Sequence, residues 1–278
     1  MHVAKTVPQI RALRQQIDDP VGFVPTMGYL HAGHLALVRR ARAENTTLIA
    51  SIYVNPSQFG ASEDLAGYPR ELNRDLELLQ GGGVDVVFVP CDAQMYPPGF
   101  STWVDVQEIS ERLEGASRPG HFRGVATVVA KLFNIVQPSR AYFGQKDAQQ
   151  VLVIRRMVAD LNMGVEVSVE PTVRESDGLA MSSRNSYLSP EQRRAATVLF
   201  RALALARQLR EGGEADAENI RRRMTSLIQA EPLAQVDYVS IADAVTLEEL
   251  NSIDRPALAL LAVRIGKTRL IDNMPLAI

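Results

Sequence analysis

The stretch GFVPTMGYLHAGHLALVRRAR (residues 22–42) decides the fold class of this chain. Its first five residues, 22–26, form a short apolar run that is typical of a buried strand, and residues 35–42 have helical periodicity. The polar, glycine-containing turn within PTMGYLHAGH (residues 25–34) separates the two. A strand, a glycine-containing turn and a helix in this order predict the first unit of a parallel α/β sheet.

The same alternation continues to about residue 173. Strands are expected at residues 47–54, 84–89, 141–143 and 165–169, and helices at residues 70–79, 124–136 and 147–161. Nearly continuous apolar strands that alternate with helices indicate a parallel sheet covered on both faces. We therefore expect a Rossmann-like, doubly wound α/β domain over residues 1–173, in which ligands bind at the carboxyl ends of the strands.

A second, smaller α+β domain is expected over residues 174–278. Ser189 and Pro190 are a good N-cap and first helical residue, and they predict one long helix that ends near Leu209. A helix at 217–228 and strands at 236–241, 257–264 and 268–271 follow. The tripeptide GKT at 266–268 matches the end of a phosphate-binding Walker A motif, but it lies between two strands and lacks the earlier glycine, which predicts a hairpin turn instead.

Composition excludes several classes of protein. The formal net charge of −2 gives no general attraction to nucleic acid or acidic membranes. A single cysteine, Cys91, excludes an intramolecular disulfide and a multi-cysteine metal site. The chain shows neither a signal peptide nor an apolar run of about 20 residues. We expect a cytoplasmic protein with small-molecule ligands and without nucleic-acid or membrane partners.

The turn after the first strand carries two histidines, His31 and His34. Gly28 and Gly33 allow close approach of a ligand to the backbone, and the following helix N-terminus offers N–H groups to a phosphate. Imidazoles beside a phosphate donate hydrogen bonds and stabilise the charge of a leaving group. The alternative is that both histidines only cap the loop.

Polar side chains follow two further strands. Gln58, in NPSQF (55–59), offers an amide donor and acceptor to a substrate with hydroxyls and a carboxylate, whereas the preceding Asn-Pro is explained by a turn. Lys146, in FGQKDAQQ (143–150), is one of only four lysines and is suited to hold a phosphate. Asp147 either binds ligand or caps the following helix.

Two loops complete the set. RPGHFRG (118–124) places Arg118 and His121 ahead of a helix, with an exposed basic turn as the alternative. MSSRN (181–185) provides two hydroxyls and a guanidinium that suit the β- and γ-phosphates of a nucleotide, with a plain serine-rich linker as the alternative. A mobile loop between two domains would also close over such a ligand and exclude water.

The HAGH tetrad (31–34) resembles the H-x-G-H signature of the nucleotidyltransferase superfamily, which includes the class I aminoacyl-tRNA synthetases. The five motifs at 25–34, 54–59, 118–124, 143–147 and 181–185, in this order, resemble the pantoate–β-alanine ligase family. That resemblance implies ATP-dependent joining of (R)-pantoate and β-alanine to pantothenate through a pantoyl-adenylate, with release of AMP and pyrophosphate. It also implies a homodimer, and Mg²⁺ bound through the phosphates of the substrate ATP rather than by a metal site of the protein.

The resemblance assigns roles to residues. It implies that residues 1–173 bind nucleotide and pantoate, and that residues 174–278 form a lid carrying the MSSRN loop. The expected catalytic residues are His34, His31 and Lys146. The expected ATP-binding residues are Met27, Gly28, Tyr29, Leu30, His31, Ala32, Gly33, His34, Gly144, Gln145, Lys146, Asp147, Val173, Met181, Ser182, Ser183 and Arg184. The expected substrate-binding residues are Gln58, Gln150, Pro25, Met27, Arg118 and His121. Gln145 stands where many members of the family have glutamate.

Two other functions stay open from the sequence. A different nucleotidylyltransferase would act on a phosphate ester, but Gln58 and Gln150 stand where such a substrate would need cations. A non-catalytic ATP-binding regulator would keep the fold without needing every histidine and charged position of the motifs, all of which are present. A class I synthetase is disfavoured because the short second domain shows no tRNA-binding region.

Overall fold

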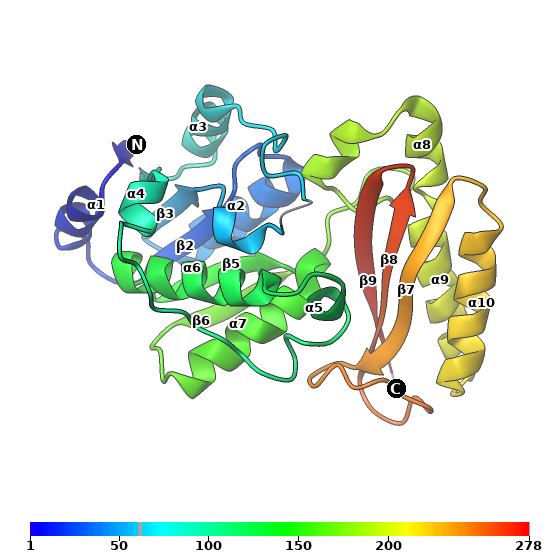
Figure 1. Cartoon of the computed structure of the whole chain (residues 1–278). Helices are drawn as coiled ribbons and strands as arrows, with labels where there is room; N and C mark the ends of the chain where they lie inside the picture. Colours follow the sequence, from blue (N-terminus) through cyan, green and yellow to red (C-terminus); the bar gives the residue numbers. More distant parts are fainter. Residues whose placement is uncertain (61–62, 278) are drawn as a thin grey trace. The chain divides into compact units, whose positions relative to one another are not determined.

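The computed structural model describes residues 1–60 and 63–277, and it consists of two compact units (Figure 1). One unit contains residues 1–144 and 149–171, and the other contains residues 145–148 and 172–278. The short segment 145–148 groups with the C-terminal unit although it follows a strand of the first unit.

The first unit is built on a six-stranded parallel sheet with the strand order β1-β4-β3-β2-β5-β6. The strands are β1 (His2–Ala4), β2 (Val21–Thr26), β3 (Thr47–Ile52), β4 (Val86–Phe88), β5 (Arg140–Gly144) and β6 (Glu166–Glu170). Residues 21–24 of β2 are all buried, as expected for a strand that is covered on both faces. This architecture confirms the predicted doubly wound α/β fold.

The order of the strands reverses between β2 and β5. From β2 the chain proceeds through β3 and β4 toward one edge of the sheet, and then returns to β5 and β6 on the other side of β2. Ligands of doubly wound sheets bind at the carboxyl ends of the strands beside such a reversal. The PTMGYLHAGH motif begins within β2 and continues past its carboxyl end.

Helices surround this sheet. They are α1 (Val7–Arg14), α2 (Ala32–Glu44), α3 (Leu72–Gly81), α4 (Asp92–Met95), α5 (Glu114–Ser117), α6 (His121–Val136) and α7 (Ala148–Asp160). Helix α2 packs on β2, β3 and β5 through a core that includes Val24, Leu37 and Val38. The sequence patterns did not indicate β1 and α1, since a three-residue strand has no measurable period and α1 buries only Ile10.

The second unit pairs a three-stranded antiparallel sheet with two helices. Strands β7 (Ala234–Asp243), β8 (Ala257–Ile265) and β9 (Thr268–Leu276) lie in sequence order. Helices α9 (Val198–Glu211) and α10 (Ala217–Gln229) pack on them around one apolar core. Ile265 pairs with Thr268, so Gly266 and Lys267 form the predicted hairpin turn, and Gly266 adopts φ +59°.

The single helix expected from Ser189 to Leu209 is wrong. The structure has α8 (Pro190–Ala195) and α9, separated by a turn at 196–197. At this turn the Thr197 hydroxyl donates to the Arg194 carbonyl (2.8 Å), and the Leu199 N–H bonds the Ala196 carbonyl three residues back. A threonine hydroxyl competes with the backbone for helix carbonyls, and the apolar spacing does not reveal that competition.

None of the helices in the described ranges is both long and apolar enough to cross a membrane.

Candidate functional site

The two histidines of the motif form a reciprocal cap at the start of α2. His31 is the N-cap, and its Nδ1 accepts a hydrogen bond from the Gly33 N–H (3.2 Å). His34, three residues later, accepts the His31 N–H on its own Nδ1 (3.3 Å), and the ring centroids lie 4.1 Å apart. Because each Nδ1 must offer a lone pair, the proton of each neutral ring is on Nε2. These capping bonds use only Nδ1 of each ring, so the capping and ligand roles are compatible.

The turn ahead of α2 is held by a carboxylate that the sequence reasoning missed. Asp75 of α3 is 1% exposed and accepts the backbone N–H groups of Tyr29 (2.7 Å) and Leu30 (2.8 Å). Gly28 and Tyr29 have φ of +83° and +50°, so the backbone here adopts the left-handed region. The one available signal was that Asp75 lies a turn before the buried Leu79 on the same helix face.

Gln58 lies in a short 3₁₀ helix, η1 (Pro56–Gln58), directly after β3. Its Nε2 donates to Met27 Sδ (3.1 Å), and its Oε1 accepts from Asn55 Nδ2 (3.1 Å). Asn55 is 1% exposed and also donates to the Gly124 carbonyl (3.2 Å). Asn55 is thus more than a turn residue, because it joins the motif at 54–59 to helix α6 and orients the Gln58 amide.

Helix α6 approaches η1 so closely that only glycine fits at Gly124. A Cβ at this position would lie 2.3 Å from the Ser57 carbonyl oxygen and 2.7 Å from the Gln58 nitrogen. The packing of α6 on η1 therefore sets where Gln58 lies relative to the residues at the start of α6.

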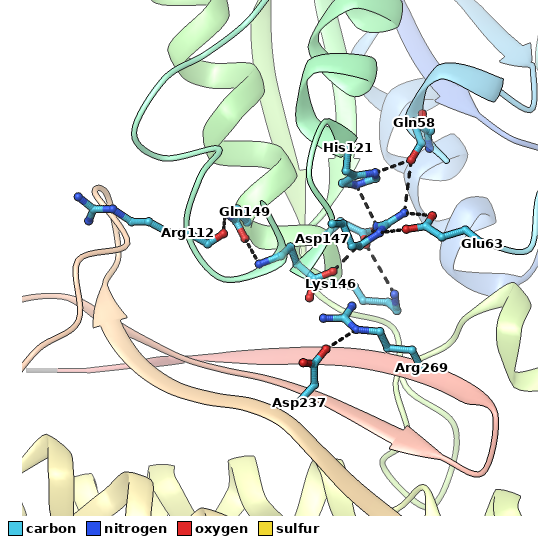
Figure 2. A network of polar contacts seen from close by, with 11 residues as sticks. Gln58, Glu63, Arg112, His121, Lys146, Asp147, Gln149, Asp237 and Arg269 are labelled. Atoms are coloured by element: carbon cyan, nitrogen blue, oxygen red, sulfur yellow. Dashed lines mark hydrogen bonds and ion pairs between the residues drawn. The ribbon is translucent and has the colours of Figure 1, made fainter. Parts of the chain in front are cut away.

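Arg118 and His121 form a half-buried polar cluster with Gln58 and Glu63 of the same unit (Figure 2). Arg118 makes a bidentate ion pair with Glu63, with Nε–Oε1 and Nη2–Oε2 distances of 2.7 Å each. His121 Nδ1 lies 2.8 Å from the Gln58 carbonyl oxygen, and its Nε2 lies 3.0 Å from Arg118 Nη1. The Arg118 side chain is only 16% exposed, so the motif is not the exposed basic turn considered from the sequence.

The same cluster keeps His121 neutral. Burial, and secondly the neighbouring Arg118 charge, lower the pKa of His121 from 6.5 to about 4. A neutral His121 donates through Nδ1–H to the Gln58 carbonyl and accepts the Arg118 N–H on Nε2. The ring is thereby fixed in one tautomer at neutral pH.

Gln150 and its neighbour differ in what they contact. Gln149 is buried, and its Nε2 donates to the Arg112 carbonyl at 2.8 Å (Figure 2). The same Nε2 donates to the Ile109 carbonyl (2.8 Å), and Oε1 accepts the Glu114 N–H (3.0 Å). Gln149 is therefore a packing residue of unit 1. Gln150, the expected substrate residue, follows it on α7 and is half-buried.

In the second unit, the turn that carries Lys146 is a 3₁₀ helix, η2 (Gln145–Asp147). Lys146 Nζ lies 3.7 Å from Asp147 Oδ1, so Asp147 is the acidic neighbour of the lysine and not only a residue ahead of α7. Asn273 of β9 binds this turn, donating to the carbonyls of Gln145 and Lys146 at 2.9 Å each. No sequence pattern had marked Asn273.

The MSSRN loop of the second unit is ordered by its own side chains. The Met181 N–H bonds the Val173 carbonyl (2.9 Å), and the Ser182 hydroxyl accepts the Arg184 N–H (3.3 Å) at the start of η3 (Ser183–Tyr187). Asn185 donates to Glu175 Oε1 (3.0 Å) and to the Ala180 carbonyl (3.1 Å). These bonds distinguish the loop from a plain linker.

Among the residues that the structure describes, no three His, Cys, Asp or Glu side chains lie together as they would around a metal ion.

Known proteins resemble this chain over its whole length. The family model for pantoate-beta-alanine ligase matches residues 2–275. A pantothenate synthetase from Roseiflexus castenholzii is 63% identical over 273 residues, covering 98% of each chain, and one from Herpetosiphon aurantiacus is 61% identical over 275 residues, covering 99% of each.

Solved structures agree with these matches. The crystal structure of pantothenate synthetase from Thermus thermophilus has a TM-score of 0.95 at 53% identity and covers 99% of both chains. Pantoate-beta-alanine ligase from Francisella tularensis, complexed with beta-gamma ATP and beta-alanine, has a TM-score of 0.82 at 36% identity, covering 99% of this chain and 97% of that one. These similarities confirm the resemblance drawn from the five motifs.

Proposed function

The chain belongs to the pantoate–β-alanine ligase family, and from this premise we propose that it is an enzyme joining (R)-pantoate to β-alanine with consumption of ATP. The products are pantothenate, AMP and pyrophosphate, and the intermediate is pantoyl-adenylate. The observation that supports the proposal is the reciprocal histidine cap of α2, in which His31 and His34 stand at the N-cap and N3 positions of a helix that follows a strand.

In the first half-reaction a pantoate carboxylate oxygen attacks the α-phosphorus of ATP, and the bond to the bridging oxygen of pyrophosphate breaks. Negative charge grows on the departing pyrophosphate. Backbone N–H groups at the start of α2, with the Nε2–H groups of His31 and His34, are suited to stabilise it. Residues 27–34 would surround the nucleotide, with the Asp75 carboxylate behind them holding the turn.

We assign the nucleotide-handling groups of the second unit to the same half-reaction. Lys146 would neutralise phosphate charge as a compact cation, and Gln145, Asp147 and Val173 of the second unit belong to the same proposed ATP-binding set, as does Gly144 of the first unit. In the loop, the hydroxyls of Ser182 and Ser183 and the guanidinium of Arg184 would bind the β- and γ-phosphates, where a guanidinium gives bidentate hydrogen bonds. Met181 belongs to the same proposed ATP-binding set.

The acid substrate suits the cluster around Gln58. Pantoate carries hydroxyls and a carboxylate, for which the Gln58 amide, with Pro25, Met27 and the half-buried Gln150, offers donors, acceptors and apolar contact. His121 is neutral and the Arg118 charge is paired with Glu63, so the cluster supplies little net positive charge. A nucleotidylyltransferase acting on a phosphate ester would need an excess of cations here, which disfavours that alternative.

In the second half-reaction the amine of β-alanine attacks the acyl carbon of the adenylate, the acyl–oxygen bond to AMP breaks, and the amine loses a proton. Holding the amine against the adenylate and excluding water are the main contributions we assign to the enzyme. The structure of the Francisella tularensis relative, complexed with beta-gamma ATP and beta-alanine, supports the assignment of both ligands to this chain.

Three further assignments accompany the proposal. Mg²⁺ would arrive bound to the phosphates of ATP, as it commonly does, and would screen their charge. The functional form would be a homodimer. The enzyme would work in the cytoplasm.

The test is to incubate the purified protein with Mg-ATP and pantoate, with and without β-alanine, and to follow pyrophosphate, AMP and pantothenate. We expect pyrophosphate release to require pantoate but not β-alanine. AMP release should require both pantoate and β-alanine. AMP formation that ignores pantoate and β-alanine would refute the ligase. Absence of any turnover in the folded, ATP-binding protein would favour the regulator.

A further inference from the structure

The strand β9 carries two adjacent buried polar residues, Asp272 and Asn273, which are 2% and 3% exposed. A polar side chain is tolerated in the protein interior only when it is hydrogen-bonded. The hydrogen-bond partners of Asp272 and Asn273 therefore show which segments these two side chains hold in place. Both sets of partners lie in the second unit. Those of Asn273 lie in the turn η2 (residues 145–147), called the lysine turn below, and the partner of Asp272 is Arg174, in the segment that leads into the MSSRN loop (residues 181–185), called the serine loop below.

Asn273 holds the lysine turn through its side-chain amide. Its Nδ2 donates to the carbonyls of Gln145 and Lys146 (2.9 Å each), and its Oδ1 accepts from Gln145 Nε2 (2.9 Å). The amide therefore binds the turn with both its donor and its acceptor end. Aspartate at this position would have a carboxylate facing two carbonyl oxygens, and alanine would leave those carbonyls without this buried donor.

Asp272 holds the segment that leads into the serine loop. Its carboxylate makes a bidentate ion pair with Arg174, with Oδ2–Nη1 and Oδ1–Nη2 distances of 2.6 and 3.0 Å. Arg174 Nη1 also donates to the Gly178 carbonyl (3.0 Å), and its guanidinium lies 4.8 Å from the centre of the Phe200 ring. Gly178 has φ +92° and would place a Cβ 2.0 Å from that ring, so this segment has one tightly packed arrangement.

The two residues are also joined to each other. The Asn273 N–H donates to Asp272 Oδ1 (2.8 Å), and Arg174 Nη2 lies 3.4 Å from the Asn273 carbonyl oxygen. The lysine turn, β9 and the segment at 174–180 thus form one hydrogen-bonded framework within the second unit. This framework explains why residues 145–148 group with the C-terminal unit.

We propose that Asn273 is a positioning residue for adenylation, which fixes the Lys146 turn on the same framework that Asp272 and Arg174 build under the serine loop. Lys146 and the serine loop then form a single, pre-positioned set of phosphate-binding groups. The proposal rests on the function assigned to Lys146 above. Asn273 itself touches neither substrate nor nucleotide; it acts by placing the lysine.

The experiment compares Asn273→Ala and Asn273→Asp with the wild type in the two half-reactions, measured separately by rapid mixing. We expect the rate of pantoate-dependent pyrophosphate release to fall by on the order of tenfold or more and the KM for ATP to rise, because misplacement of a catalytic group by about 1 Å costs up to roughly 10²-fold. Reaction of preformed pantoyl-adenylate with β-alanine should stay within about twofold of wild type, since that step does not involve the triphosphate.

Ser240→Ala is the matched control. Ser240 is 2% exposed, lies on β7 of the same sheet, and bonds Glu249 (2.6 Å) away from the lysine turn. It should lower thermal stability without changing adenylation. The effects of substitutions within one hydrogen-bond network are not additive. In a Lys146→Ala background, Asn273→Ala should therefore lower the adenylation rate by less than about a further threefold. A loss that is fully additive with Lys146→Ala, or that affects both half-reactions equally, would overturn the positioning role.

A second readout does not depend on catalysis. Amide hydrogen exchange in peptides spanning residues 145–148 should accelerate in Asn273→Ala and not in Ser240→Ala. Unchanged exchange with a wild-type adenylation rate would sink the inference. If exchange accelerates while the wild type itself shows no pantoate-dependent pyrophosphate release, the anchoring of the turn stands and the proposed function fails.

Discussion

Asp75→Asn tests whether one buried carboxylate holds the turn that we propose binds the nucleotide. The carboxylate accepts the N–H groups of Tyr29 and Leu30 at 2.7 and 2.8 Å and is 1% exposed. An asparagine has one acceptor oxygen, so one of these N–H groups would face an NH₂ group with no acceptor there. An unsatisfied buried group costs about 1–3 kcal/mol. For a domain of this size, a loss of about 2 kcal/mol corresponds to a fall in Tm of roughly 4–8 °C.

Differential scanning calorimetry and pantoate-dependent pyrophosphate release would measure the two consequences. We expect the lower Tm together with a slower adenylation, since the turn carries the backbone that precedes His31. Asp216→Asn is the matched control, because Asp216 also accepts two backbone N–H groups, from Glu218 (2.9 Å) and Asn219 (3.1 Å), but at an exposed N-cap where asparagine serves equally well.

A Tm within about 1 °C of wild type, together with unchanged adenylation, would refute the reasoning. It would mean that the turn keeps its left-handed backbone without the carboxylate. A lower Tm with an unchanged adenylation rate would mean that Asp75 contributes to stability only and has no role in the proposed site.

Three further predictions concern the histidines and the packing beneath Gln58. The pKa of His121 is about 4 in the folded protein against 6.5 in the unfolded chain, so its contribution to stability is present above pH 6.5 and is lost as pH falls toward 4. Urea unfolding should therefore show a fall of roughly 2 kcal/mol in the free energy of unfolding between pH 7.5 and pH 5. His121→Gln should abolish this fall. Gly124→Ala should destabilise the protein by about 1–3 kcal/mol and raise the KM for pantoate, because its Cβ would displace the Ser57 carbonyl; equal pantoate KM values would contradict this. His34→Gln keeps an N3 side-chain acceptor for the cap but lacks the imidazole, so adenylation should fall on the order of 10²-fold at unchanged Tm, whereas a change below twofold would leave His34 a purely structural role.

The sequence was informative where a residue's neighbours along the chain determine its structure. The apolar run of β2 and the helical spacing after it define one α/β unit, and Gly266-Lys267 between two apolar runs defines a hairpin. The start of α2 was less accessible. His31 and His34 precede the apolar stripe, so periodicity placed them in a turn, while the structure makes them N-cap and N3 of the helix.

Other features depend on contacts between distant residues. Asp75 meets Tyr29 and Leu30, and Asn273 meets Gln145 and Lys146, across separations of 45 or more and 127 or more positions respectively. In each case the main partner is a backbone N–H or carbonyl group. Every residue has a backbone carbonyl, and every residue except proline has a backbone N–H. The partner's identity therefore leaves no mark in the sequence that would identify the pair.

This difference explains why sequence motifs reveal the residues that contact a ligand but not the residues that hold them in place. Groups that touch a ligand must have particular chemistry, so imidazoles, a lysine and hydroxyls at glycine-rich turns stand out. Groups that hold those turns from behind need only a buried donor or acceptor of the right length, as Asp75 and Asn273 supply. Misplacing a catalytic group by about 1 Å costs up to roughly 10²-fold in rate, which reaches the lower end of what a general acid contributes. Substitutions at these two buried positions should therefore impair adenylation as strongly as several substitutions in the motifs themselves.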